Sequence, residues 1–182
     1  MDIFSYIFMA WGLSEIVLNV AARSKAGKAD AKDKGSIIII WVTLAVSIFA
    51  GVIIAVNYPA FGKLRTIAGA ALVVAGVLFR WFAIISLGKM FTTNVSIQNE
   101  HKLKTDGLYA VLRHPSYTGS LMSFLGLGIS LGNIYSLIVV FIPVTLAFLY
   151  RIKVEEDALS KHFGEEYANY KSRTKKLIPY IF

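Results

Sequence analysis

Five runs of apolar residues constrain this chain more than any other feature of its sequence. They lie at about 3–22, 36–58, 66–87, 117–131 and 134–150. A helix needs about 20 apolar residues to cross the hydrocarbon core of a bilayer, with a lower limit near 17. With 56% of its 182 residues hydrophobic, the chain is also more apolar than a typical soluble domain. We therefore expect an all-α integral membrane protein with five transmembrane helices.

The boundaries of these runs also bear on domain organisation. Only Gly132-Asn133 separates the last two runs, which favours a tight helical hairpin. The first run lacks the basic start of a signal peptide and contains Glu15, so we expect it to remain as a helix. No low-complexity linker divides the sequence, and we expect one domain over 1–182. The absence of cysteine excludes disulfides, thiolate metal sites and a cysteine nucleophile.

The distribution of basic residues predicts orientation, because Lys and Arg are retained on the cytoplasmic side. Segment 23–34 contains five of them, whereas the loop 57–65 contains two. The segments 88–119 and 151–179 are also basic. We therefore expect the N-terminus outside, the C-terminus in the cytoplasm and these two segments on the cytoplasmic side. Charge placed in loops of this kind favours membrane lipid, and not nucleic acid, as the partner.

Glu15 and Arg80 are ionisable residues inside the apolar runs, where a charge is costly. Counted along helices that run in the same direction, both lie in the cytoplasmic third of the bilayer. Three interpretations stay open: an ion pair between the first and third helices, a role in binding substrate, or snorkelling of Arg80 to the interface. The fourth run favours close helix packing through its small residues, Gly119, Ser123, Gly126, Gly128 and Gly132.

Two polar segments carry the candidate chemistry. Arg113-His114-Pro115-Ser116-Tyr117 opens the fourth run, and a proline at this place is typical of a helix N-terminus. The same turn can also bind a small anionic group through free helix N–H groups. Arg151 and Glu155 lie four residues apart and share a helix face. They form either a weak surface pair or a ligand pair in which Glu155 holds an ammonium and Arg151 a carboxylate.

The order of these motifs is similar to that of one enzyme family. Arg113-His114-Pro115-x-Tyr117-x-Gly119, Arg151-x-x-x-Glu155-Glu156 and Phe163-Gly164-x-Glu166-Tyr167 follow one another along the chain. Together they resemble the isoprenylcysteine carboxyl methyltransferase family in its prokaryotic form. The resemblance covers roughly Leu87 to Pro179, about half of the chain.

The resemblance implies an integral membrane methyltransferase that uses S-adenosylmethionine as cofactor. It implies a cytoplasmic cofactor-binding loop and a C-terminal helical tail, with the cofactor region at about 88–119 and 151–179. Arg151 and Glu155 would be the catalytic residues, and Arg151 would meet the substrate. The implied cofactor contacts are Asn94, His101, Lys102, Leu103, Lys104, Tyr109, His114, Pro115, Ser116, Tyr117, Glu155 and Glu156.

Methyl transfer from a sulfonium needs an aligned nucleophile and a dry site, without a covalent protein intermediate. His101, His114 and His162 do not share the spacing of metal ligands, so we expect no metal site. The expected acceptor is lipophilic or amphipathic, either a small molecule or a lipid-modified one, and the oligomeric state stays open.

Three alternatives to this function remain. One is a phospholipid N-methyltransferase. Another is an NADPH-dependent sterol reductase, whose similar turn usually carries an acidic residue where this chain has Ser120. The third is a non-catalytic membrane scaffold.

Overall fold

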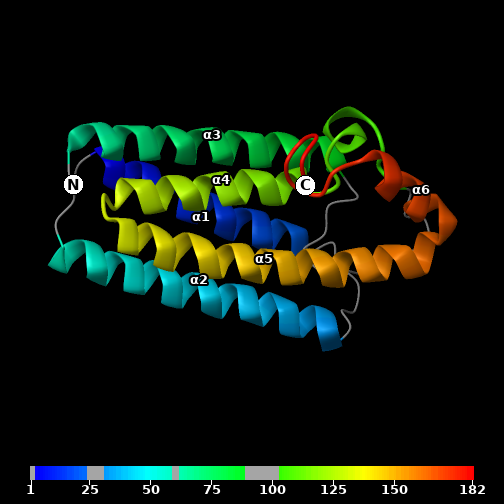
Figure 1. Cartoon of the computed structure of the whole chain (residues 1–182), viewed down its shortest axis with the longest axis horizontal. Helices are drawn as coiled ribbons and strands as arrows, with labels where there is room; N and C mark the ends of the chain where they lie inside the picture. Colours follow the sequence, from blue (N-terminus) through cyan, green and yellow to red (C-terminus); the bar gives the residue numbers. More distant parts are fainter. Residues whose placement is uncertain (1–2, 24–30, 59–61, 89–102) are drawn as a thin grey trace.

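The computed structural model describes residues 3–23, 31–58, 62–88 and 103–182. Within the described residues, five long helices lie side by side, a short helix lies at one end of the bundle, and the C-terminus lies near the same end (Figure 1). The elements are α1 (Ile3–Arg23), α2 (Ala31–Asn57), α3 (Lys63–Leu87), the 3₁₀ turn η2 (Gly107–Ala110), α4 (Pro115–Ser130), α5 (Ile134–Phe163) and α6 (Glu165–Arg173). α4 packs between α3 and α5, α2 packs on α5, and α1 lies on α3.

The turn before α4 and the polar segment after Arg151 lie at the same end of the bundle. α1 and α3 end there, α2 and α4 begin there, and the C-terminal part of α5 continues past the other helices to α6 (Figure 1). The α4–α5 turn lies at the opposite end. The turn before α4 and the segment after Arg151 are therefore brought together, although the whole of α4 and half of α5 separate them in sequence.

The helices match the predicted apolar runs closely, with two differences. α2 begins earlier than expected, at Ala31, because Lys32, Asp33 and Lys34 continue the helix without being apolar. α5 continues beyond Tyr150 to Phe163. Its 30 residues are about 45 Å long, which exceeds the hydrocarbon core of about 30 Å. The C-terminal part of α5 thus carries its charged residues beyond the length that a bilayer requires.

In the part of the chain that the structure describes, three helices are long and apolar enough to cross a membrane, namely Gly35–Asn57, Leu64–Leu87 and Ile134–Phe163. α1 contributes a shorter apolar stretch, Phe4–Leu18, and α4 has 16 residues. Large apolar side chains stand exposed on the outside of the bundle, including Phe49, Leu78 and Phe82. An exposed apolar surface of this extent is stable against lipid and not against water. The chain is a helical membrane protein, and five full spans stay a prediction.

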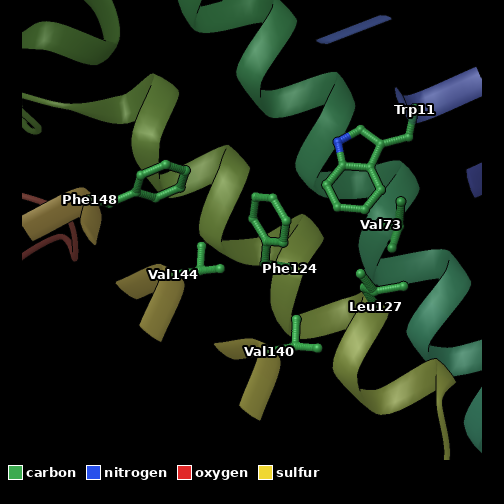
Figure 2. Close-up of a cluster of buried hydrophobic side chains, with 7 residues drawn as sticks. All are labelled: Trp11, Val73, Phe124, Leu127, Val140, Val144 and Phe148. Carbon is green, nitrogen blue, oxygen red and sulfur yellow. The ribbon is translucent and has the colours of Figure 1, made fainter. Parts of the chain in front are cut away.

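The apolar core lies where α1, α3, α4 and α5 meet. Trp11 and Phe124 contact each other edge to face, with ring centroids 4.9 Å apart. Val140, Val144 and Phe148 reach this core from α5, and Val73 reaches it from α3 (Figure 2). Phe148 also lies 5.5 Å from the ring of Tyr117, measured between centroids. The core therefore extends up to the first turn of α4, where the polar residues begin.

Close approach of α3 and α4 depends on small residues, as the sequence predicted for Gly119, Ser123 and Gly126. A Cβ on Gly126 would lie 2.6 Å from the carbonyl oxygen of Gly69, and one on Gly119 would lie 2.6 Å from the amide nitrogen of Arg80. Ser123 donates its hydroxyl to the Val73 carbonyl at 3.3 Å. This face of α4 therefore determines how closely α3 can pack against α4.

Gly128 permits close packing of α4 against α5, since a Cβ there would lie 2.6 Å from Cδ1 and 3.0 Å from Cα of Leu137. Gly132 adopts a φ of 72° in the α4–α5 turn, a backbone conformation that glycine adopts without steric cost. The Asn133 side chain caps α5 by accepting a hydrogen bond from the Tyr135 amide at 2.8 Å. The predicted tight hairpin is confirmed.

Substituting Gly126 with alanine should lower the free energy of unfolding by about 1–3 kcal/mol, the usual cost of overpacking. The new methyl group would meet the backbone of Gly69 and Val73, which cannot rotate away. Thermal unfolding in detergent measures the effect. Gly12→Ala is the matched control, because nothing lies within 4 Å of its Cβ position and alanine favours a helix. Equal unfolding temperatures for both variants would contradict the close packing.

Candidate functional site

The start of α4 is fastened to α1 and α3 by an ion pair within the bundle. Arg80 of α3 contacts Glu15 of α1, with Nε and Oε1 2.8 Å apart. Of the three interpretations of these residues, the ion pair is confirmed. Arg80 also donates from Nη1 to the Ser116 carbonyl at 3.1 Å. The pair therefore holds the first turn of α4 in place, which is the turn that carries the candidate cofactor residues.

The turn before α4 is also bound to the C-terminal segment 174–177. Lys175 donates its amide to the Val111 carbonyl at 2.9 Å, and the amide of Arg113 donates to the Lys175 carbonyl at 2.8 Å. The Thr118 hydroxyl donates to the Leu177 carbonyl at 2.7 Å. These hydrogen bonds join residues about 60 positions apart in sequence. The C-terminal segment is thus part of the site and not a separate tail.

Glu156 is the centre of a buried charged network. Its Oε1 accepts from Arg113 Nε at 2.9 Å and lies 3.2 Å from His114 Nε2. The side chain is only 9% exposed. Arg113 also donates to the carbonyls of Lys171 and Thr174. Charge-assisted hydrogen bonds of this kind are the strong ones, so Glu156 joins α5 to the turn before α4 and to the end of α6.

Glu155 lies next to Glu156 but has a different environment. Its side chain is 31% exposed, and its Oε2 lies 3.9 Å from Nδ1 of His114. His114 itself is buried, and its ring lies against the ring of Tyr117 at 5.8 Å between centroids. Of the two glutamates, Glu155 therefore has the carboxylate that a ligand can reach.

The predicted cofactor residue Tyr109 has partners within the protein. Its hydroxyl donates to the Ala83 carbonyl at 3.3 Å, and its own carbonyl accepts from the Tyr170 hydroxyl at 2.7 Å. Burial raises the pKa of the Tyr109 hydroxyl, so it stays protonated and remains a donor. Tyr109 thus connects α3, η2 and α6 behind the turn.

Tyr167 of α6 is buried beside the same glutamates. It is 1% exposed, and among the residues that the structure describes its hydroxyl has no hydrogen-bond partner. Burial raises the pKa of this hydroxyl, and the charges of Glu156 and Glu155 raise it further. A buried hydroxyl without a partner is costly, so it marks a place for a polar ligand atom or a water molecule.

Arg151 lies on α5 one turn before Glu155, but it is buried and not at the surface. Its side chain is 4% exposed, and it forms an ion pair with Asp33 in the first turn of α2. Nη1 also donates to the Ser36 hydroxyl oxygen at 2.6 Å. Tyr117 and Glu155 are its further electrostatic neighbours. Arg151 therefore joins α2 to the start of α4, and the exposed surface pair considered from the sequence is not its environment.

The remaining predicted cofactor residues are placed as follows. Lys104 pairs with Asp106 at 2.9 Å, and this hydrogen bond lowers the pKa of the Asp106 carboxyl. Leu103 is half-buried, and Pro115 and Ser116 form the first turn of α4. Asn94, His101 and Lys102 lie outside the described residues.

Sequence reasoning assigned no role to Asp33 or Ser36. A signal for Asp33 was present, since an arginine in an apolar helix needs a counter-ion, and Asp33 lies at the start of another apolar run. Tyr167 was part of a motif but had no assigned contact. Its burial beside Glu155 and Glu156 depends on the folded structure.

A bundle of helices with an apolar outer surface and a buried polar network at one end defines an integral membrane protein with a candidate site at that end. The model of the isoprenylcysteine carboxyl methyltransferase (ICMT) family matches residues 69–161, about half of the chain. The chain belongs to this family.

The relatives that the chain resembles are longer proteins. It is 36% identical over 115 residues to protein-S-isoprenylcysteine O-methyltransferase B of Arabidopsis thaliana, which covers 62% of this chain and 58% of the relative. It is 35% identical over 127 residues to protein-S-isoprenylcysteine O-methyltransferase of Saccharomyces cerevisiae, covering 69% of this chain and 53% of the relative. The chain thus spans between half and three fifths of these relatives.

A solved structure supports the fold. The structure of the eukaryotic intramembrane Ras methyltransferase ICMT superposes with a TM-score of 0.63 at 29% identity. The superposition covers 78% of this chain and 52% of that chain. The helical arrangement described above therefore matches that solved structure over the superposed part of the chain.

Proposed function

We propose that this chain is a membrane-embedded, S-adenosylmethionine-dependent methyltransferase that modifies the carboxylate of a lipophilic acceptor, such as a lipid-modified cysteine. The observation that carries the proposal is the pair formed by Glu155 and Arg151. They lie one turn apart on α5, with Glu155 beside His114 and Arg151 buried toward α2. Family membership favours this function over a phospholipid N-methyltransferase, a sterol reductase or a scaffold.

The residues at the start of α4 fit the polar groups of the cofactor. S-adenosylmethionine carries an ammonium, a carboxylate and a methyl group on a positively charged sulfur, from which a carboxylate oxygen can accept the methyl. The accessible Glu155 carboxylate suits the ammonium, and the first turn of α4 suits the carboxylate. The Tyr167 hydroxyl, which has no hydrogen-bond partner within the described residues, provides a further polar contact. We propose that Asn94 and His101 to Lys104 complete this cofactor site.

The chain's own residues would act by positioning. A carboxylate is already ionised near neutral pH and therefore needs no general base. Arg151 would hold it bidentately, because a planar guanidinium matches the geometry of a carboxylate. The apolar walls formed by Phe148 and Tyr117 would exclude water from the acceptor. Holding both reactants in line supplies most of the rate enhancement that such a reaction requires.

We propose that α1 to α5 all cross the membrane as one domain, with the N-terminus outside and the polar end of the bundle in the cytoplasm. A reporter fused after Phe182 should then behave as cytoplasmic, because the C-terminal segment is bound to the turn before α4. A reporter fused before Met1 is the matched control and should report the outside. If both reporters lie on the same side, an even number of helices crosses and the proposed topology is wrong.

The experiment that tests the proposed function is equilibrium binding to the detergent-purified chain. S-adenosylmethionine should bind, and NADPH should not. Methyl transfer from labelled S-adenosylmethionine to an S-farnesylcysteine, compared with phosphatidylethanolamine, then identifies the acceptor class. Binding of NADPH alone would favour the reductase, and binding of neither would contradict an enzyme of this family.

A further inference from the structure

The first turn of α2 contributes a charged residue that the family match does not include. Asp33 and Arg151 form an ion pair in which the side chains are 2% and 4% exposed, respectively. The hydroxyl of Ser36 accepts from Arg151 Nη1 at 2.6 Å and donates to the Asp33 carbonyl at 2.8 Å. These three residues therefore form a closed unit between α2 and α5. Asp33 lies outside the matched segment 69–161.

Stability alone does not account for this unit. A buried ion pair loses in desolvation much of what it gains in attraction, and well-packed apolar residues often stabilise a protein equally well. The three contacts to Asp33 and Ser36 are all made by one guanidinium nitrogen, Nη1. Tyr117 and Glu155, on the other elements of the candidate site, are further electrostatic neighbours of the same side chain. Arg151 is thus bound to the first turn of α2 and lies next to residues proposed to bind the cofactor.

We propose that Asp33 is a positioning residue, which holds Arg151 in the orientation that receives the acceptor carboxylate. An arginine side chain has many rotamers, and fixing one of them before binding removes an entropy cost from binding. Asp33 also provides a counter-ion while no acceptor is bound, since an unpaired buried arginine would be costly. The first turn of α2 is therefore part of the acceptor site. This inference rests on the proposed function.

The test compares an S-farnesylcysteine that has a free carboxylate with its methyl ester, using the full chain in detergent. The unmodified protein should bind the acid more tightly than the ester, because only the acid can pair with Arg151. Asp33→Asn keeps the shape of the side chain and removes its charge. It should weaken binding of the acid about tenfold, the lower end of the effect of losing a hydrogen bond to a charged group. Binding of the ester and of S-adenosylhomocysteine should change by less than about twofold.

Ser136→Ala is the matched control. Ser136 donates to the Gly51 carbonyl at 2.9 Å and also joins α5 to α2, but it lies in the first turn of α5, about four turns before Arg151. It should change stability without changing the preference for acid over ester. A purely structural role of Asp33 predicts that Asp33→Asn behaves like Ser136→Ala. That result, or equal losses for acid and ester, overturns the inference.

A second variant covers the case in which Asp33→Asn does not fold. The double substitution Asp33→Leu and Arg151→Met replaces the pair with apolar residues, which restores folding in comparable cases. It should bind S-adenosylhomocysteine and show no preference for the acid. If it keeps the preference, Arg151 does not meet the carboxylate and the inference is wrong. Failure of the unmodified protein to bind S-adenosylhomocysteine would contradict the proposed function separately, because the acid and ester comparison does not require the cofactor.

Discussion

Arg113→Ala is expected to lower the free energy of unfolding by about 3–5 kcal/mol, the range found when one partner of a buried ion pair is removed. The side chains of Arg113 and Glu156 are 10% and 9% exposed, respectively. Without Arg113, the buried Glu156 carboxylate keeps His114 as a close partner, with Lys171 at 3.6 Å. The carbonyls of Lys171 and Thr174 lose a donor as well. Thermal unfolding in detergent measures the loss.

Arg173→Ala is the control for this variant. Arg173 is exposed in the last turn of α6, and its removal should cost less than about 0.5 kcal/mol. The double variant Arg113→Ala with Glu156→Ala should lose less than the sum of the two single losses, because the residues share one interaction. Additive losses, or an Arg113 effect as small as that of Arg173, would show that the network does not join α5, α6 and the turn before α4.

Glu155→Gln is expected to weaken binding of both S-adenosylmethionine and S-adenosylhomocysteine about ten- to a hundredfold. The reason is that a hydrogen bond to a charged group contributes about 1.5–3 kcal/mol, and glutamine removes the charge while it keeps the shape. The partly exposed side chain of Glu155 lies beside His114, where a ligand ammonium can reach it. Equilibrium binding to the purified protein measures the change, without requiring an acceptor.

Variants of two neighbouring acidic residues distinguish a specific loss of cofactor binding from the general effect of removing a negative charge. Asp157→Asn changes an exposed carboxylate on the same helix and should leave cofactor affinity unchanged. Glu156→Gln should mainly reduce stability, because Glu156 is bound to Arg113 and His114. If a folded Glu155→Gln variant binds both ligands as tightly as the unmodified protein, Glu155 does not belong to the site.

The sequence predicts some of these residues because their environment has a local signal. A long apolar run predicts a helix whatever the rest of the fold is. The reason is that, in lipid, every backbone N–H and C=O group must be hydrogen-bonded within the segment. The Glu15–Arg80 pair was also predictable, because two opposite charges at similar depth in a bilayer have few other partners. The ends of the helices were predicted less accurately. α2 begins among charged residues. Hydrophobicity identifies the part of a helix that lies in lipid, and a helix can continue beyond that part.

The different roles of two adjacent glutamates were not predictable. Glu155 and Glu156 are chemically identical, and the motif names them together. The structure buries Glu156 with Arg113 and leaves Glu155 accessible, because successive residues on a helix point about 100° apart. Which of the two glutamate side chains is buried depends on the C-terminal segment. This segment packs beside the turn before α4, although about 60 residues separate them in sequence.

The sequence by itself determined the membrane helices, their hairpin, the small-residue face of α4 and the family of this chain. Each of these depends on residues close together in the chain or on the hydrophobicity of one segment. Only the tertiary structure decided the pairing of Arg151 with Asp33, 118 residues away, and the burial of Tyr167 beside the two glutamates. Partners of this kind are chosen by the way separate helices pack, because packing alone brings distant charges within a few ångströms and excludes the water that would otherwise solvate them.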